Sequence, residues 1–154
     1  YFPSKAAIVD QLIAHDLAQV EQDFHTILTA PDPLQNMRTL LRGRLQRHQA
    51  GIDGPLWAEI TAAASRKPEI GCACQHMEAA IASYMTQAFA LVTGLPVAES
   101  QRRFSAHAAL IIVLVKSAAM MVPQQSPARG DLNALIMRII DELLDEVASA
   151  TVKG

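Results

Sequence analysis

Cys72, Cys74 and His76 form the one cluster in this 154-residue sequence whose spacing suggests metal chemistry. Residues four apart share one face of a helix, so Cys72 and His76 could contact a single ion. Cys74 points away from that pair, no second ligand cluster occurs, and structural zinc takes four ligands at defined spacings. We therefore expect a protein with no metal and no cofactor, and regard a metal sensor as the weaker alternative. Both cysteines are expected to be reduced thiols, because their orientation on the helix does not allow a disulfide bond between them.

Arg44 and His48 lie one helical turn apart, in register with the apolar residues Met37 and Leu41. In a pocket, these two side chains could hold an anionic or polar ligand. The alternative is that Arg44 reaches solvent along its aliphatic stem and that His48 is a partly exposed residue at a helix end.

The sequence lacks the common motifs of catalytic sites. The sequence contains no glycine-rich phosphate loop, no Gly-x-Ser-x-Gly elbow and no His-Glu-x-x-His pair. We therefore predict that the protein is not an enzyme.

Larger or more polar side chains recur on the faces of the predicted helices that should point inward. Each alone is more often plain core, but sensor pockets combine apolar walls with a few convergent polar groups. Tyr84, His107 and His48 are the expected hydrogen-bonding groups. The predicted ligand pocket comprises Met37, Leu41, Arg44, His48, Trp57, Met77, Ile81, Tyr84, Phe104, His107 and Ile111, with Met120 as a further inward residue.

Proline, glycine and aspartate divide the chain into six helical segments, which would position these residues. Half of the residues are apolar (51%) and only 5% are aromatic, which favours an all-α fold. The predicted helices run from a Ser4 cap to before Pro31, from an Asp32 cap with Pro33 to near Gly51, over 55–67, from Pro68 to Gly94, over 97–122, and from an Asp131 cap onward.

Charge and hydropathy restrict the class of protein and its cellular location. The formal net charge of −2 lacks the positive excess of a free-standing nucleic-acid-binding protein. The sequence shows no basic-then-apolar leader, and the longest apolar run, 108–115, is far shorter than the ~20 residues that cross a bilayer. We expect a cytoplasmic protein that does not enter a membrane.

The last two long helices carry more apolar surface than one small domain can cover. The helix over 97–122 is apolar almost all round, and the last helix has a broad leucine and isoleucine stripe. The alternative is a monomer with a central apolar helix, but we favour a homodimer joined by a four-helix bundle. Its expected interface residues are Ile112, Val115, Ala119, Leu132, Leu135, Ile136, Ile139, Ile140 and Leu143.

The opening residues, Tyr1-Phe2-Pro3-Ser4-Lys5-Ala6-Ala7-Ile8, resemble the segment that ends the recognition helix in TetR-family transcriptional repressors. That pattern has Tyr or His, Phe, a turn residue, a capping Ser, Lys and then an apolar residue three positions later. The motif covers only this junction, and the rest of the chain resembles the family in architecture alone. The chain also starts without Met, and we interpret it as a fragment of a longer protein.

The resemblance implies that two parts of the chain have different roles. Residues 1–5 would be the remnant of a helix-turn-helix headpiece, and residues 6–154 the effector-binding and dimerisation domain. Tyr1 and Lys5 would contact operator DNA phosphates, while the missing headpiece would read the bases. A small-molecule effector would change the headpiece spacing and release operator DNA. The alternative is a helical small-molecule, lipid-binding or interaction module that never binds DNA.

Overall fold

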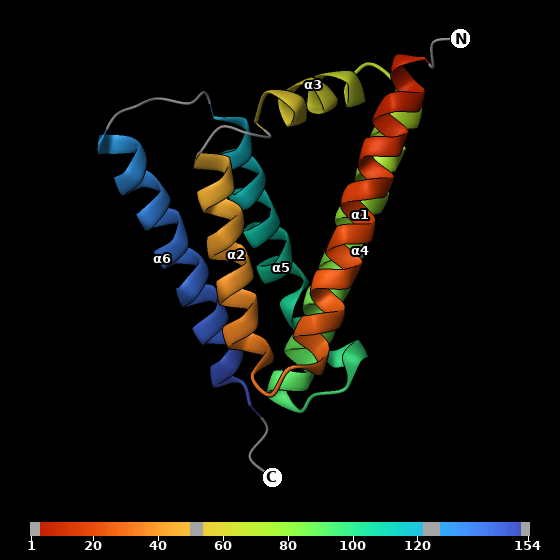
Figure 1. Ribbon diagram of the computed structural model, residues 1–154. Coiled ribbons are helices and arrows are strands. Elements are labelled where there is room, and N and C mark those ends of the chain that lie inside the picture. The colour runs from red at the N-terminus through yellow and green to blue at the C-terminus, as the bar shows by residue number, and fades with distance from the viewer. Residues whose placement is uncertain (1–3, 50–53, 122–126, 152–154) are drawn as a thin grey trace.

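The computed structural model describes residues 4–49, 54–121 and 127–151, and these residues are helical apart from short turns. The prediction of an all-α protein with six helices is confirmed (Figure 1). The helices are α1 (Lys5–Thr29), α2 (Pro33–Gln49), α3 (Gly54–Ala64), α4 (Pro68–Thr93), α5 (Val97–Met120) and α6 (Pro127–Ser149).

Local capping chemistry sets several of these helix ends where the sequence predicts them. The Ser4 hydroxyl accepts a hydrogen bond from the Ala7 amide at 3.1 Å, and the Asp32 carboxylate accepts one from the Gln35 amide at 3.0 Å. Helix α4 ends at Gly94, whose φ of 74° is the left-handed conformation that glycine adopts without strain. These caps fix where α1 and α2 begin and where α4 stops.

The start of α6 differs from the prediction. We expected a loop to Gly130 and a cap at Asp131, but α6 begins at Pro127, so Asp131 lies inside the helix. Proline is well suited to the first helical position because its φ is already helical and its missing N–H has no partner there. A glycine such as Gly130 costs only about 1 kcal/mol in a helix, so it does not stop one.

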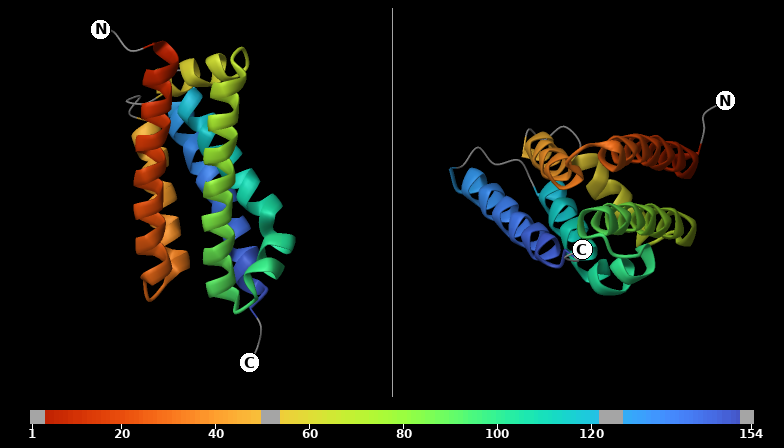
Figure 2. Two further views of the ribbon diagram at one scale, coloured as in Figure 1. Left: turned by 90° about the vertical axis from the view of Figure 1, so that its right-hand side faces the viewer. Right: turned by 90° about the horizontal axis from the view of Figure 1, so that it is seen from below.

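The helices pack as a bundle with α6 on one side (Figures 1 and 2). Helices α1 and α4 lie side by side, α5 packs on α4 and α2, and α3 lies across one end against α4 and α5. Helix α6 packs mainly on α2, and it also contacts α4 and α5. A smaller apolar cluster joins α1, α3 and α4 through Val9, Ile13, Ile60, Ile70 and Met77.

Helix α5 is central but incompletely covered. Phe104, Ala108 and Ile111 are buried in the main core, whereas Leu110 and Val113 are 42% and 55% exposed. Among the described residues, α5 is the one helix that is long and apolar enough to cross a membrane, a test of length and composition that core helices of soluble proteins also pass.

Candidate ligand cavity

A cavity of about 180 Å³ lies between the first five helices. Its walls are mostly apolar, and Met37, Ile60, Met85 and Ile111 are almost fully buried in them. The lining residues are Asp16, Val20, Asp23 and Phe24 of α1; Met37, Leu40, Leu41 and Arg44 of α2; Trp57, Ile60, Thr61 and Ala64 of α3; Cys74, Met77, Glu78, Ile81 and Met85 of α4; and Ile111, Ile112, Val115, Lys116 and Ala119 of α5.

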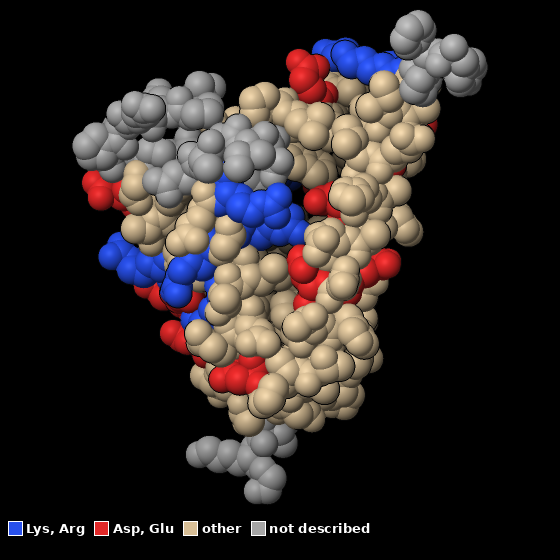
Figure 3. Space-filling view, in the orientation of Figure 1, with Lys and Arg blue, Asp and Glu red and all other residues tan. Residues whose placement is uncertain are grey.

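Arg44 links α2 to α1 across the cavity wall. Its guanidinium group lies 3.6 Å from an Asp16 carboxylate oxygen and 3.4 Å from an Asp23 oxygen. The two aspartates are seven residues apart, so they project from the same face of α1. All three side chains are about three-quarters or more buried, which limits solvent screening of the pairs. Acidic and basic side chains also gather where α1 faces α2 in Figure 3.

A second charged pair joins α4 to α5. The Lys116 ammonium group donates a hydrogen bond to the Glu78 carboxylate at 2.5 Å. Cys74 lies one helical turn before Glu78 and also lines the cavity. Burial raises the pKa of the Cys74 thiol; Lys116 works against that shift, and Glu78 adds to it. The thiol is therefore less readily ionised than an exposed one.

The structure brings seven of the predicted pocket residues together around this cavity. They are Met37, Leu41, Arg44, Trp57, Met77, Ile81 and Ile111. The side chain of His48 lies outside the described residues. The half-buried Met120 does not line the cavity.

Tyr84, Phe104 and His107 are placed elsewhere. The Tyr84 ring stacks on Phe24 with centroids 5.5 Å apart. The rings of Phe104 and His107 meet edge to face at 5.4 Å, and the His107 imidazole lies 3.4 Å from a Glu146 oxygen on α6. None of the three lines the cavity. Their inward direction was predictable, but two inward residues on one helix can face different neighbours.

The residues predicted at a subunit interface fall into three groups. Ile112, Val115 and Ala119 line the cavity. Ile136 and Ile140 are buried in the core of their own chain and have little surface for a partner. Leu132 and Leu135 are exposed, and Ile139 and Leu143 are half-buried.

Four charged lining residues were missed by sequence reasoning: Asp16, Asp23, Glu78 and Lys116. A signal was available for the two aspartates, because they flank Val20 within the apolar stripe of α1. Acidic residues on such a stripe require a cation on a neighbouring helix, and Arg44 supplies it.

Among the described residues, no three His, Cys, Asp or Glu side chains gather as a metal site. Cys72 and His76 are exposed on α4, whereas Cys74 faces the cavity. Lys5 is exposed at the start of α1, and Tyr1 lies outside the described residues.

Comparisons with protein-family models, curated proteins and solved structures find no match to this chain. The cavity combines apolar walls with ion pairs at its edge, an arrangement suited to binding a small apolar molecule that carries a polar group.

Proposed function

We propose that this chain is the effector-binding and dimerisation domain of a ligand-responsive transcriptional repressor of the TetR type. The observation that supports this most is the apolar cavity lined by five of the six helices, including α1. By the resemblance of residues 1–8, the headpiece would be attached to that same helix. A ligand in the cavity would therefore contact the element that carries the DNA-binding part.

The volume of the cavity restricts the effector. A cavity of about 150 Å³ accepts a benzene ring, so one of about 180 Å³ suits a small aromatic or short branched molecule. A polar group on the effector would bind beside Arg44 or Lys116. Binding would favour the conformer in which the headpieces no longer match successive major grooves, and a few kcal/mol of differential affinity is enough to change DNA occupancy.

Exposed apolar residues on α5 and α6 support a homodimer. Leu110 and Val113 on α5 and Leu132 and Leu135 on α6 are each more than a third exposed. Stable homodimers bury apolar surface of this kind in large interfaces.

The effector site is tested with indole and isothermal titration calorimetry. Val115 and Leu114 are adjacent, half-buried residues of α5, but only Val115 lines the cavity. We expect Val115→Trp to abolish indole binding and Leu114→Trp to preserve it, with circular dichroism showing that both variants fold. Equal binding by the two variants would contradict the proposed site.

The dimer is tested by sedimentation velocity. Leu135→Glu on α6 should give a monomer, whereas Leu56→Glu on α3, with nearly the same exposed fraction, should remain dimeric. A monomeric parent chain would refute the proposed assembly.

The DNA-binding role is tested with the whole protein that the gene encodes and duplex DNA from upstream of that gene. In a mobility-shift titration, Lys5→Gln should weaken binding and reduce the slope of log affinity against log salt by about 1. Arg102→Gln, an exposed charge at the start of α5, should leave both unchanged. Failure of the whole protein to bind DNA would favour a ligand-binding module without DNA binding.

A further inference from the structure

A second cavity, of about 410 Å³, lies between α2 and α6, outside the cavity proposed for the effector. It shares no lining residue with the first one, because the two cavities face different sides of α2. Its lining residues are Arg42, Leu45 and Gln46 of α2 and Gly130, Asn133, Ala134, Met137, Arg138 and Asp141 of α6.

Asn133 is the unusual residue of this cavity. The residue is 8% exposed, and neither the amide nitrogen nor the amide oxygen of its side chain has a hydrogen-bond partner. Buried polar groups are nearly always hydrogen-bonded, because leaving them unpaired costs their full desolvation penalty. An amide also needs two kinds of partner: an acceptor for Nδ2 and a donor for Oδ1.

The surroundings of Asn133 indicate the chemistry of a molecule that could satisfy it. Leu45 and Met137 are buried beside it and provide an apolar floor. Arg138 is exposed and has no ion-pair partner in the part of the chain that the structure describes. The nearest approach of Arg42 to a carboxylate is 3.9 Å, to Asp141.

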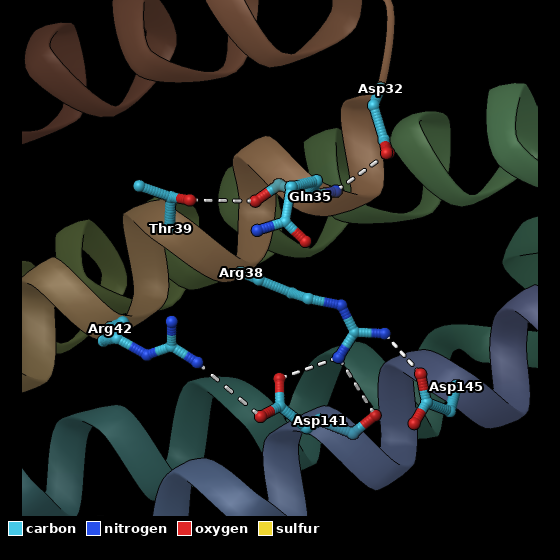
Figure 4. A network of polar contacts seen from close by, with 7 residues as sticks. All are labelled: Asp32, Gln35, Arg38, Thr39, Arg42, Asp141 and Asp145. Carbon is cyan, nitrogen blue, oxygen red and sulfur yellow. Dashed lines mark hydrogen bonds and ion pairs between the residues drawn. The ribbon is translucent and has the colours of Figure 1, made fainter.

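The carboxylate of Asp141 is shared between Arg38 and Arg42, and it forms no ion pair with Arg138 among the described residues. It accepts a hydrogen bond from Arg38 at 2.7 Å, and Asp145 accepts another from the same guanidinium group (Figure 4). Arg138 is therefore the exposed arginine at the rim of the cavity that remains available for an anion, and a planar carboxylate matches the geometry of its guanidinium group.

We propose that the α2–α6 cavity binds a small carboxylate that carries an O–H or N–H donor next to the carboxyl group and an apolar tail. The carboxylate accepts hydrogen bonds from Asn133 Nδ2 and from the Arg138 guanidinium group. The neighbouring donor binds Asn133 Oδ1, and the tail lies on Leu45 and Met137. α-Hydroxy and α-amino acids with apolar side chains have this pattern.

The experiment uses phenyllactate, phenylpropionate and phenyllactamide with the isotope-labelled chain, followed by nuclear magnetic resonance. The second probe lacks the hydroxyl group and the third lacks the negative charge. Each is added to about 10 mM, which largely fills a site with a Kd of about 1 mM. We expect phenyllactate to shift the Asn133 side-chain amide resonances and the two analogues to bind at least about tenfold more weakly.

Variants locate the binding. Arg138→Gln should weaken phenyllactate binding about tenfold, and Asn133→Leu should abolish it. Arg102→Gln on α5 should leave the affinity unchanged. Val115→Trp, which fills the effector cavity, should also leave the affinity for phenyllactate unchanged. The outcome of this experiment is therefore independent of the outcome for the proposed function.

Three results would overturn the proposal. These are unshifted Asn133 resonances at the highest probe concentration, equal binding of all three probes, or an Arg138→Gln variant with parental affinity. If Asn133→Leu fails to fold, the Arg138→Gln and probe comparisons still decide the outcome.

Discussion

Arg38 on α2 donates a hydrogen bond of 2.7 Å to the carboxylate of Asp141 on α6. The same guanidinium group lies 3.4 Å from the Asp141 carbonyl oxygen and also bonds Asp145, one turn further along α6 (Figure 4). The Arg38 side chain is only 16% exposed, and that of Asp141 is 32% exposed. This contact ties the outer helix to the rest of the bundle.

We predict that Arg38→Leu lowers the free energy of unfolding by about 1 kcal/mol, because it leaves the partly buried Asp141 carboxylate without its main partner. Urea denaturation measures the change. Arg102→Leu removes a similar pair, with Glu99, from an arginine that is 75% exposed. Solvent screens such pairs, so this control should show no measurable loss. Equal losses in both variants would contradict the special role of Arg38.

Gly54 supplies a second stability prediction, because α3 begins against the backbone of α5. A Cβ atom at Gly54 would lie 2.6 Å from the Ala119 carbonyl oxygen. Gly54→Ala should therefore destabilise the protein by about 1–3 kcal/mol through overpacking.

Gly43→Ala is the matched control for that change. Gly43 lies within α2, and a Cβ atom there meets nothing within 4 Å. This substitution should stabilise the protein by about 0.5–1 kcal/mol through helix propensity. Thermal unfolding of both variants gives the comparison, and stabilisation by Gly54→Ala would show that the α3–α5 approach is loose.

The fold was predictable because its signals are local. Helix boundaries follow from side chains that bond their own backbone, as Ser4 and Asp32 do. The start of α6 was not predictable from Asp131, because aspartate also occurs within helices and the proline at position 127 was a competing start signal.

The sequence alone could not show which apolar residues of a helix are buried in the core, which line the cavity and which are exposed. In α6, the residues at 136, 140, 144 and 147 are buried, while Leu132 and Leu135 on the same broad stripe are exposed. The helical period places all of them on one side but does not show where the neighbouring helix ends. The same limit explains why Ile112 and Val115 line the cavity, although we assigned them to an interface.

Tyr84 leads to a prediction about alkaline pH. Its burial, together with the nearby Glu21 carboxylate, raises the pKa of the phenol above its ordinary value. The native state therefore holds this proton more tightly than the unfolded state. The resulting stability is fully present below the unfolded pKa of about 10 and is lost as the pH rises through the higher folded pKa.

Tyr84→Phe removes this titration while keeping the stack on Phe24. Urea unfolding between about pH 8 and pH 11 should show a smaller loss of stability in the variant than in the parent chain. Parallel stability profiles for the two proteins would contradict the raised pKa.

Cys72 and Cys74 provide a chemical probe of the effector cavity, since they are close in sequence but differently placed. Cys72 is exposed, whereas Cys74 is half-buried in the cavity wall and burial raises its pKa. The thiolate is the reactive form, so at about pH 8 iodoacetamide should modify Cys72 at least several-fold faster than Cys74. The single-thiol variants Cys74→Ser and Cys72→Ser, followed by mass spectrometry, measure the two rates separately.

Because Cys74 lines the cavity, saturating indole should slow its modification further and leave Cys72 unaffected. Equal slowing at both cysteines would mean that indole acts on the reagent or the whole fold, and no slowing at Cys74 would place indole outside this cavity.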